Sequence, residues 1–415
     1  MLDGIYHATL KLRRVGSAGA PFTYKALDPG AVTVDGVHLY GAQYNLIAGL
    51  QVVGLPATDY AQVGVYLFAD GATSSDHNTI SDVTVSGVAG WGIRVCGSWN
   101  VLDSIKVAHS ASEGVLFCCP SGDNPCSRPP IGNRLSRADI SASGQSGIGL
   151  DGGQDIVVEF VRSHDNRSNG WLDGQSDVGV VVRDSEFDHN GTTRLSHGVY
   201  TKARSALFQR IKLHHNAGFG FHCWASCFGT TDKPFVVEDS DSYENAGCGF
   251  LAGGNSGEAE PGRDGYPHHV IFRNDRAYRN RGAGLCYLGE CKRDPVRAEV
   301  LFVRNEAWDN GYGQGTINGC NTDAVKFREN YFWSSDEDGA LIRAWNSHVP
   351  EDTFDSDRLW RGYSGLRSLG TVVWNDIAYS LKDVQLQGVR QNASACPPPY
   401  DGRVKLESHG VWGRP

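Results

Sequence analysis

One short pattern that returns along most of the chain constrains the fold more than any other feature. A glycine followed by a short apolar strand pattern recurs at intervals of 22 to 35 residues. The glycines of this series are Gly64, Gly92, Gly114, Gly147, Gly170, Gly198, Gly220, Gly249 and Gly284. Each interval holds two or three short strands with their turns, and no helical pattern interrupts the series. Repeats of this length are typical of a solenoid built from stacked β-coils.

An asparagine also recurs, after the second strand of each repeat and often in the context Asn-x-Gly. The series comprises Asn166, Asn190, Asn216, Asn245, Asn280 and Asn310. An Asn at the same corner of successive coils can bond the backbone and side chain of its neighbours, and so form a ladder. We therefore expect these residues to lie in one line, with Asn216 and Asn245 on adjacent coils. A β-sandwich with Gly-rich turns is the alternative, but sandwiches do not repeat Asn-x-Gly in register.

The repeats predict an all-β fold, a right-handed parallel β-helix (solenoid) of about ten coils. We expect residues 1–333 to form this domain. Beyond Trp333 the repeat fades into acidic loops and scattered tryptophans. Residues 334–415 are therefore predicted to be a C-terminal cap packed on the helix, because an open solenoid end would template aggregation.

The composition argues against nucleic acid and membrane partners and favours an oxidising compartment. A net charge of −9 argues against nucleic acid, and no run approaches the ~20 apolar residues of a membrane span. Eleven cysteines suggest an oxidising environment, although several could simply be small buried hydrophobes. We therefore expect a secreted protein, and because the sequence begins inside a predicted strand, we expect its export signal to be absent from this chain.

The cysteine spacings suggest several disulfides but do not settle their connectivity. Coil stacking makes Cys96 and Cys118 neighbours on adjacent coils, which predicts a cross-coil pair. Close pairs that could staple loops are Cys119 with Cys126, Cys223 with Cys227, and Cys286 with Cys291.

The stretch from Leu195 to Trp224 combines the repeat with reactive side chains. Strand residues alternate between inside and outside, so with Val199 and Phe221 inward, four side chains point outward. These are Tyr200, Lys202, His222 and Trp224. Stacking of equivalent positions about 5 Å apart would place Tyr200 beside His222 and Lys202 beside Trp224. Taken singly, each has a plainer interpretation: Lys202 as a solvated charge, Tyr200 as a packing residue and His222 as a polar surface residue.

Three motifs together resemble a known family. They are the opening GSAGAPFTYKALDPGAVTVDG, the recurring Asn, and the turn Ser196-His-Gly-Val-Tyr before a strand. The chain resembles the secreted right-handed β-helix polysaccharide lyases of the pectate-lyase and alginate- or chondroitin-lyase type, over roughly residues 4 to 333. This resemblance implies cleavage of a uronic-acid polysaccharide by β-elimination, with a Lys or Arg as base and Ca²⁺ held by acidic residues.

The resemblance gives the candidate residues their expected roles. Lys202 is the expected base, and Tyr200 or His222 the expected acid. The expected substrate-binding residues are Arg94, Arg204, Trp224 and His197. Asp151 and Asp173 are the expected ligands of Ca²⁺. We expect an acidic polysaccharide as the partner of a monomeric protein.

Two other classes of function remain open from the sequence. A β-helix glycoside hydrolase would use two carboxylates drawn from Asp151, Asp173 and Asp177. A non-catalytic glycan-binding β-helix or phage-type adhesin would need no reactive group. A trimeric tailspike is disfavoured by the cysteine count, because proteins assembled in reducing cytosol seldom use so many.

Overall fold

The computed structural model describes most of the chain in two compact units, Met1–Gly218 and Phe219–Pro415. The described residues are 1–54, 62–69, 73–119, 128–174, 176–225, 227–255, 264–289, 298–318, 324–335, 341–345, 354–355, 357–361, 371–374, 377–380, 390–391 and 394–395. Within them, no helix has the length and hydropathy that a bilayer crossing requires.

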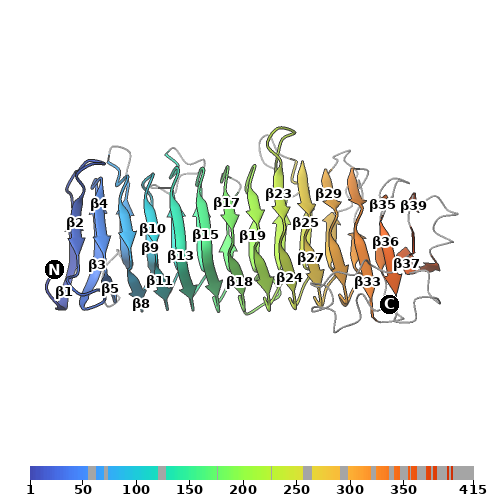
Figure 1. The fold of residues 1–415 in the computed structure, drawn as a ribbon, viewed down its shortest axis with the longest axis horizontal. Coiled ribbons are helices and arrows are strands. Elements are labelled where there is room, and N and C mark those ends of the chain that lie inside the picture. The colour runs from blue at the N-terminus through green and yellow to red at the C-terminus, as the bar shows by residue number, and fades with distance from the viewer. Residues whose placement is uncertain are drawn as a thin grey trace. The chain divides into compact units, whose positions relative to one another are not determined.

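Three columns of stacked parallel strands run through the first unit (Figure 1). Column 1 contains β1 (Gly4–Leu12), β3 (Val32–Tyr40), β6 (Val63–Phe68), β9 (Trp91–Val95), β12 (Val115–Cys118), β14 (Ile148–Asp151), β16 (Trp171–Leu172) and β19 (Val199–Thr201). Column 2 contains β2 (Phe22–Lys25), β4 (Asn45–Ala48), β7 (Thr79–Ser81), β10 (Val101–Asp103), β13 (Arg134–Ser141), β15 (Val157–His164), β17 (Val181–Arg183) and β20 (Leu207–Gln209). Column 3 contains β5 (Leu50–Val52), β8 (Thr84–Ser86), β11 (Lys106–Ala108), the ends of β13 and β15, β18 (Glu186–Asp188) and β21 (Lys212–His214).

The second unit has three parallel columns of its own. The first contains β22 (Phe221–Trp224), β25 (Phe250–Gly254), β28 (Leu285–Gly289), β31 (Gly315–Asn318), β34 (Ile342–Trp345) and β37 (Thr371–Trp374), to which β38 (Ile377–Ser380) pairs antiparallel. The next contains β23 (Phe235–Glu238), β26 (Val270–Arg273), β29 (Val300–Val303), β32 (Val325–Arg328), β35 (Phe354–Asp355) and β39 (Arg390–Gln391). The last contains β24 (Asp241–Tyr243), β27 (Arg276–Tyr278), β30 (Glu306–Trp308), β33 (Tyr331–Ser334), β36 (Arg358–Arg361) and β40 (Ser394–Ala395).

These columns confirm the predicted fold class, a right-handed parallel β-helix. Parallel pairing continues beyond residue 333, since Tyr331 pairs with Arg358 and Phe354 with Arg390. A separate cap formed by residues 334–415 stays a prediction.

The repeating glycine is explained by the close approach of successive coils. A Cβ atom on Gly114 would lie 2.7 Å from the carbonyl oxygen of Gly147, and one on Gly170 would lie 2.7 Å from that of Gly198. Real Cβ atoms do not approach backbone so closely. The apolar residues that follow each glycine alternate inward, and Ile93, Val115 and Val199 are fully buried. Burying such a side chain contributes roughly 1.5–3 kcal/mol.

The predicted Asn ladder is confirmed within each unit. In the first unit Asn166 Nδ2 donates to Asn190 Oδ1 (2.9 Å), and Asn190 Nδ2 donates to Asn216 Oδ1 (3.1 Å). In the second unit Asn245 donates to Asn280 and Asn280 to Asn310, both at 2.9 Å. The adjacency of Asn216 and Asn245 stays a prediction, because the two residues belong to different units.

The first unit contains a second Asn ladder that the repeat analysis missed. It runs through Asn45, Asn78, Asn100 and Asn133, with each backbone N–H donating to the next Oδ1. The residue before each of these asparagines has a left-handed φ, and three of the four are aromatic: Tyr44, His77 and Trp99. The recurring aromatic-Asn pair was the available sequence signal.

The second unit contains another ladder, in which an aspartate replaces an asparagine. Asn305 Nδ2 donates to the carbonyl of Phe272 (3.1 Å). One coil later, Asn330 Nδ2 donates to the carbonyl of Phe302 (3.0 Å). Asp275 occupies the preceding step, and its Oδ1 accepts from Ser240 N (2.9 Å). No described residue bonds its Oδ2. Burial raises the pKa of Asp275 well above its usual value, which favours the neutral, protonated carboxyl group at this step of the ladder.

Asp275→Asn is expected to stabilise the protein above neutral pH. A raised folded-state pKa gives stability that is complete below the unfolded-state pKa and is lost as pH rises through the folded-state pKa. The neutral amide removes this loss, so the variant should gain about 1–3 kcal/mol at pH 8 and less at pH 5. Thermal unfolding at both pH values measures the difference. The reverse change in the same ladder, Asn305→Asp, should lower stability at pH 8. If Asp275→Asn is less stable than the native protein at both pH values, Asp275 is not a neutral carboxyl group that an amide can replace.

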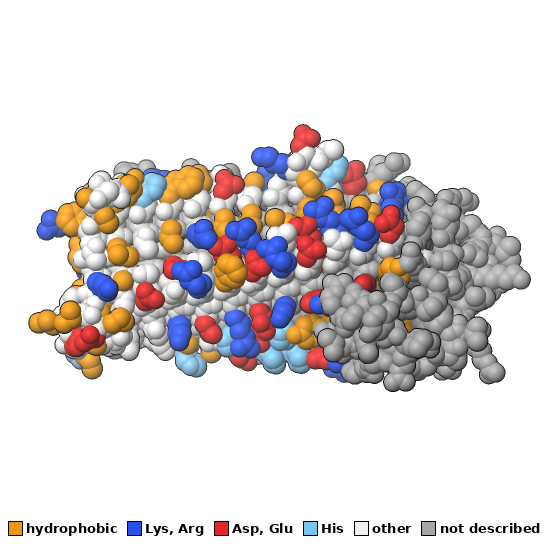
Figure 2. Space-filling view, viewed as in Figure 1, with side chains coloured by type: hydrophobic (Ala, Val, Ile, Leu, Met, Phe, Trp, Pro, Cys, Tyr) orange, Lys and Arg blue, Asp and Glu red, His pale blue; other side chains and the backbone are white. Residues whose placement is uncertain are grey.

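Charged side chains on the surface of each unit are largely paired. Figure 2 shows basic and acidic side chains interspersed on the visible face of the coils. In the first unit Arg210 Nε lies 2.6 Å from Asp184 Oδ1, and in the second Arg279 Nη1 lies 3.0 Å from Glu244 Oε1. Such surface pairs contribute only ~0.2–1 kcal/mol each, and they leave these cations partly neutralised towards an anionic ligand.

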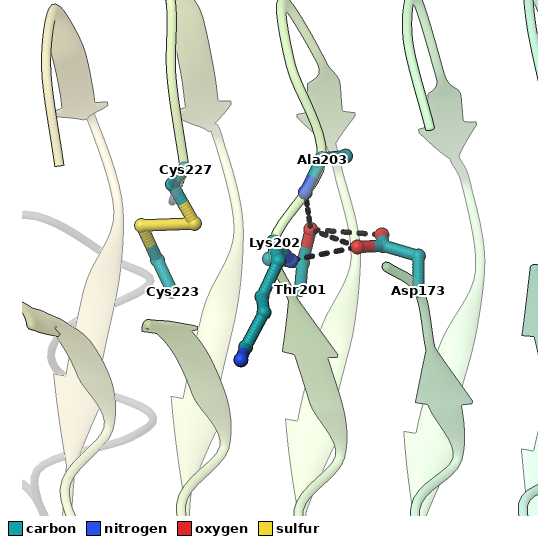
Figure 3. The surroundings of a disulfide bond; sticks show 6 residues. All are labelled: Asp173, Thr201, Lys202, Ala203, Cys223 and Cys227. Carbon is teal, nitrogen blue, oxygen red and sulfur yellow. Dashed lines mark hydrogen bonds between the residues drawn. A yellow bond between two sulfur atoms is a disulfide. The ribbon is translucent and has the colours of Figure 1, made fainter. Parts of the chain in front are cut away.

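The predicted disulfides are confirmed in part. Cys96 bonds Cys118 on the next coil, with the two Cα atoms 4.9 Å apart. Cys223 bonds Cys227 (Figure 3). The proposed Cys286–Cys291 pair is wrong, because Cys286 bonds Cys248 across neighbouring coils. The partner suggested for Cys119, Cys126, lies outside the described residues.

Candidate functional site

Lys202 and Tyr200 lie at the end of column 1 in the first unit. Tyr200 is the outward residue of β19, and Lys202 follows directly after this strand. Both side chains are half-buried. The Lys202 ammonium nitrogen lies 5.9 Å from the centroid of the Tyr200 ring. A cation and a phenol therefore stand together at the surface of the coils, as the strand alternation predicted.

A buried carboxylate fixes the backbone that carries Lys202. Asp173 Oδ1 accepts a hydrogen bond from Lys202 N (2.7 Å), and the Thr201 hydroxyl donates to both carboxylate oxygens (2.9 and 2.8 Å). Trp171 Nε1 donates to Asp173 Oδ2 (2.7 Å). The Thr201 oxygen in turn accepts from Ala203 N (3.2 Å), while the Lys202 side chain extends away from the carboxylate (Figure 3). This clamp holds the residues on both sides of Lys202.

The clamp was missed from the sequence, although a signal was present. The register of column 1 places Val95, Phe117 and Leu150 at the inward position that Thr201 occupies on its own coil. Thr201 is fully buried, and a polar residue at an apolar position requires a buried partner. Strict alternation from the inward Trp171 also predicts that Asp173 points inward.

The two aspartates of this region are buried inside the coil. Asp173 is 3% exposed and Asp177 is fully buried. Asp177 accepts from Gly174 N (2.7 Å) and from Gly153 N. Burial raises the pKa of both carboxyl groups, and the neighbouring charge of Asp173 raises that of Asp177 further. Neither side chain can act on a polymer that lies on the surface.

The expected calcium pair does not fit these positions. Asp151 is exposed at the end of β14, whereas the oxygens of Asp173 are occupied by donors from Trp171, Thr201 and Lys202. Calcium takes 6–8 oxygen ligands, and a carboxylate enclosed by N–H and O–H donors is not available as one of them. Asp173 therefore cannot supply a calcium ligand.

Asp151 and Lys202 nevertheless share a row of column 1. Gly149 pairs with Leu172, and Leu172 pairs with Tyr200. Two residues further along each coil, the same register aligns Asp151 with Gly174 and Gly174 with Lys202. Two strand spacings separate Asp151 from Lys202 by about 10 Å. Gly174 presents no side chain between the two charges, and a Cβ at this position would lie 3.6 Å from Asp177 Oδ2.

The two expected arginines lie at different distances from Lys202. Arg94 lies four strand spacings from Tyr200 in column 1, about 19 Å away. Its guanidinium stacks over Trp91 (4.9 Å) and its Nε donates to Cys118 Sγ (3.1 Å). Arg204 is exposed two residues beyond Lys202. Arg204 is thus the nearer candidate for a substrate carboxylate, and Arg94 could serve only a remote part of a long polymer.

His197 supports Tyr200 from inside the coil. It is 3% exposed, its backbone N–H donates to Asn169 Oδ1 (2.7 Å), and its ring centroid lies 5.6 Å from that of Tyr200. Burial lowers the pKa of His197 to about 4, so the imidazole is neutral at physiological pH. Its burial leaves almost no surface for the direct sugar contact expected from the sequence.

His222 and Trp224 lie next to each other in the second unit. Their ring centroids are 5.3 Å apart, and both side chains are half-buried. Trp224 packs against the buried cluster of Cys248, Leu251, Ala283 and Cys286. Their expected positions beside Tyr200 and Lys202 stay predictions, because those residues belong to the first unit.

Comparisons with known proteins agree on the fold. The sequence model described as "Right handed beta helix region" matches residues 63–259. Among solved structures, a mannuronic acid specific polysaccharide family 6 lyase from human gut microbiota is 12% identical, with a TM-score of 0.57, over 99% of this chain and 87% of the lyase. A mutant of the periplasmic alginate epimerase AlgG is 14% identical, with a TM-score of 0.51, over 91% and 79% of the two chains. No curated protein matches the sequence. The chain thus shares its fold with enzymes that act on polysaccharides.

Proposed function

We propose that this protein is an extracellular polysaccharide lyase that cleaves a uronic-acid polymer by β-elimination. The observation that carries the proposal is the clamped pair at the surface of column 1, with Lys202 beside Tyr200 and its backbone held by the buried Asp173. Preorganised groups of this kind suit proton transfer, because their positions are fixed before substrate arrives.

Each step of the elimination has a candidate group. Neutral Lys202 takes the proton on the carbon next to the uronate carboxyl group, and the electron pair left on that carbon delocalises into the carboxylate. The exposed Arg204 neutralises this developing charge. The pair then forms a carbon–carbon double bond as the glycosidic bond breaks, and the Tyr200 hydroxyl protonates the leaving oxygen.

The positions of the carboxylates argue against the hydrolase alternative. Glycoside hydrolysis uses two carboxyl groups that flank the scissile bond, about 5–10 Å apart. Asp173 and Asp177 are both enclosed by the coil, so they cannot flank a bond on the surface. Asp151, the exposed member of the three candidates, would lack its partner. A non-catalytic glycan-binding role remains as an outcome of the activity test.

The substrate class and the compartment have separate support. The two structural neighbours act on mannuronic acid polymer and on alginate, which are uronate substrates. Three disulfides among the described residues favour an oxidising location outside the cytosol.

A panel of uronate polymers tests the proposal. The purified protein is incubated with alginate, polygalacturonate and chondroitin, and ultraviolet absorbance and reducing ends are measured together. Elimination predicts that both rise in step on at least one polymer, because each cut creates one unsaturated end. Reducing ends without absorbance would assign hydrolysis, and no change on any polymer would favour glycan binding without catalysis.

A further inference from the structure

Three consecutive coils of the first unit place residues with metal-binding side chains just before the Asn ladder. The pairs are His164 with Asp165, Asp188 with His189, and His214 with His215. Parallel register stacks His164 on Asp188 and Asp188 on His214 at the end of column 3. Figure 2 shows histidine side chains among acidic and basic ones along the lower edge of the visible face. The Lys202 site belongs to column 1, so this cluster is separate from it.

The ligand atoms of the cluster converge within a few ångströms. Atoms offered by Asp188, His189 and His214 all lie within 4.8 Å of one another. His189 Nδ1 lies 2.7 Å from Asp188 Oδ2, and His214 Nδ1 lies 2.9 Å from His215 Nδ1. A tetrahedral site with metal–nitrogen bonds of 2.0–2.1 Å separates its ligand atoms by roughly 3.3 Å. The exposed His189 and His215 rings stack on each other with centroids 4.8 Å apart, so His215 adjoins the cluster from its exposed side.

Neighbouring groups hold the central ligands in place. Glu186 Oε1 bonds His214 Nε2 (2.9 Å), which leaves Nδ1 directed towards His215. Carboxylates that orient a ligating imidazole in this way are common around metal ions. Asp188 is fully buried and is held by two bonds from Arg162 (2.9 and 2.8 Å). Each carboxylate oxygen has two lone pairs, so Asp188 retains capacity to bind a cation beside Arg162.

We propose that Asp188, His189, His214 and His215 bind one divalent transition-metal cation of the Zn²⁺ class. Imidazole ligands select Zn²⁺ and its neighbours over Ca²⁺ and Mg²⁺, which prefer all-oxygen sites. The ligands come from two successive coils, so the ion cross-links them and stabilises the stack. This inference does not depend on the lyase proposal.

Calorimetric titration of the full, tag-free chain with ZnCl₂ at neutral pH tests the site. We expect one Zn²⁺ per chain and a melting temperature that rises with zinc. His214→Ala and His189→Asn should abolish saturable binding or weaken it strongly, and Glu186→Gln should weaken it about 10–100-fold. Asn is used at His189 because that residue has φ 53°, which Asn tolerates better than Ala.

The matched control is His109→Asn. His109 is an exposed histidine with φ 56° at the equivalent turn of an earlier coil, outside the cluster. Its replacement should leave zinc affinity unchanged. Absence of saturable binding by the unmodified protein, an equal loss in His109→Asn, or an equal rise of the melting temperature with CaCl₂ would each overturn the proposal. Melting temperatures measured without metal show whether every variant folds.

Discussion

Lys202→Ala is expected to remove nearly all turnover of a uronate polymer while leaving the fold intact. General-base catalysis contributes roughly 10²–10⁴-fold to rate, and Lys202 supplies the amine beside Tyr200. The clamp on this segment uses the backbone N–H of residue 202, which Ala retains. Stability should therefore change by about 0.5 kcal/mol or less. Steady-state kinetics and thermal unfolding measure the two effects separately.

Two further variants sharpen this prediction. Lys202→Arg should be nearly as inactive as Lys202→Ala, because a guanidinium stays protonated and cannot accept the proton. Lys106→Ala, at an exposed lysine of β11 in column 3, should retain normal activity. If Lys202→Ala turns over substrate at the native rate, Lys202 is only a solvated surface charge and not the base.

Asp173→Asn is expected to lower both stability and turnover. The carboxylate accepts hydrogen bonds from Trp171, Thr201 and the backbone of Lys202, all from inside the coil. An amide has one acceptor oxygen, and its NH₂ group would face one of these donors. Each buried donor left unsatisfied costs about 1–3 kcal/mol, so the variant should lose at least about 2 kcal/mol. The backbone that carries Lys202 would then lose its anchor, and kcat should fall more than KM rises.

A graded series separates this positioning role from plain destabilisation. Thr201→Val removes the hydroxyl link to Asp173 and the acceptor of Ala203 N, and leaves the Trp171 and Lys202 bonds. It should cost about 1–2 kcal/mol and a smaller part of kcat. Ile93→Val, a core change in β9 three strand spacings from β16, should cost a similar ~0.5–1.5 kcal/mol without lowering kcat. Equal kcat in Asp173→Asn and the native protein would contradict the positioning role.

The fold could be predicted from the sequence because every coil must meet the same steric and hydrogen-bonding requirements where it stacks on the next. Gly114 and Gly170 recur because a Cβ would strike the next coil, and Asn190 recurs because its amide bonds the next Asn. Both demands act on every coil, so they leave a periodic trace in the chain. The disulfide between Cys248 and Cys286 leaves no such trace, since it depends on how two neighbouring coils align.

The candidate site was predictable to the extent that it follows strand alternation. Tyr200 and Lys202 were placed outward correctly, because β19 is regular up to Thr201. Asp173 was misplaced at a calcium site, because the alternation that turns Trp171 inward was not continued past the end of the two-residue strand β16. Its three hydrogen-bond donors come from its own coil and from residues 28 and 29 positions later, a convergence that no local pattern reveals.

Proton NMR of the products formed from a uronate polymer tests the central claim most directly. The native protein and Lys202→Ala are compared on the same polymer at equal concentration. The β-elimination account predicts an olefinic proton signal that grows with each new chain end in the native digest and is nearly absent with Lys202→Ala. New chain ends without an olefinic signal, or equal olefinic signals from both proteins, would contradict it.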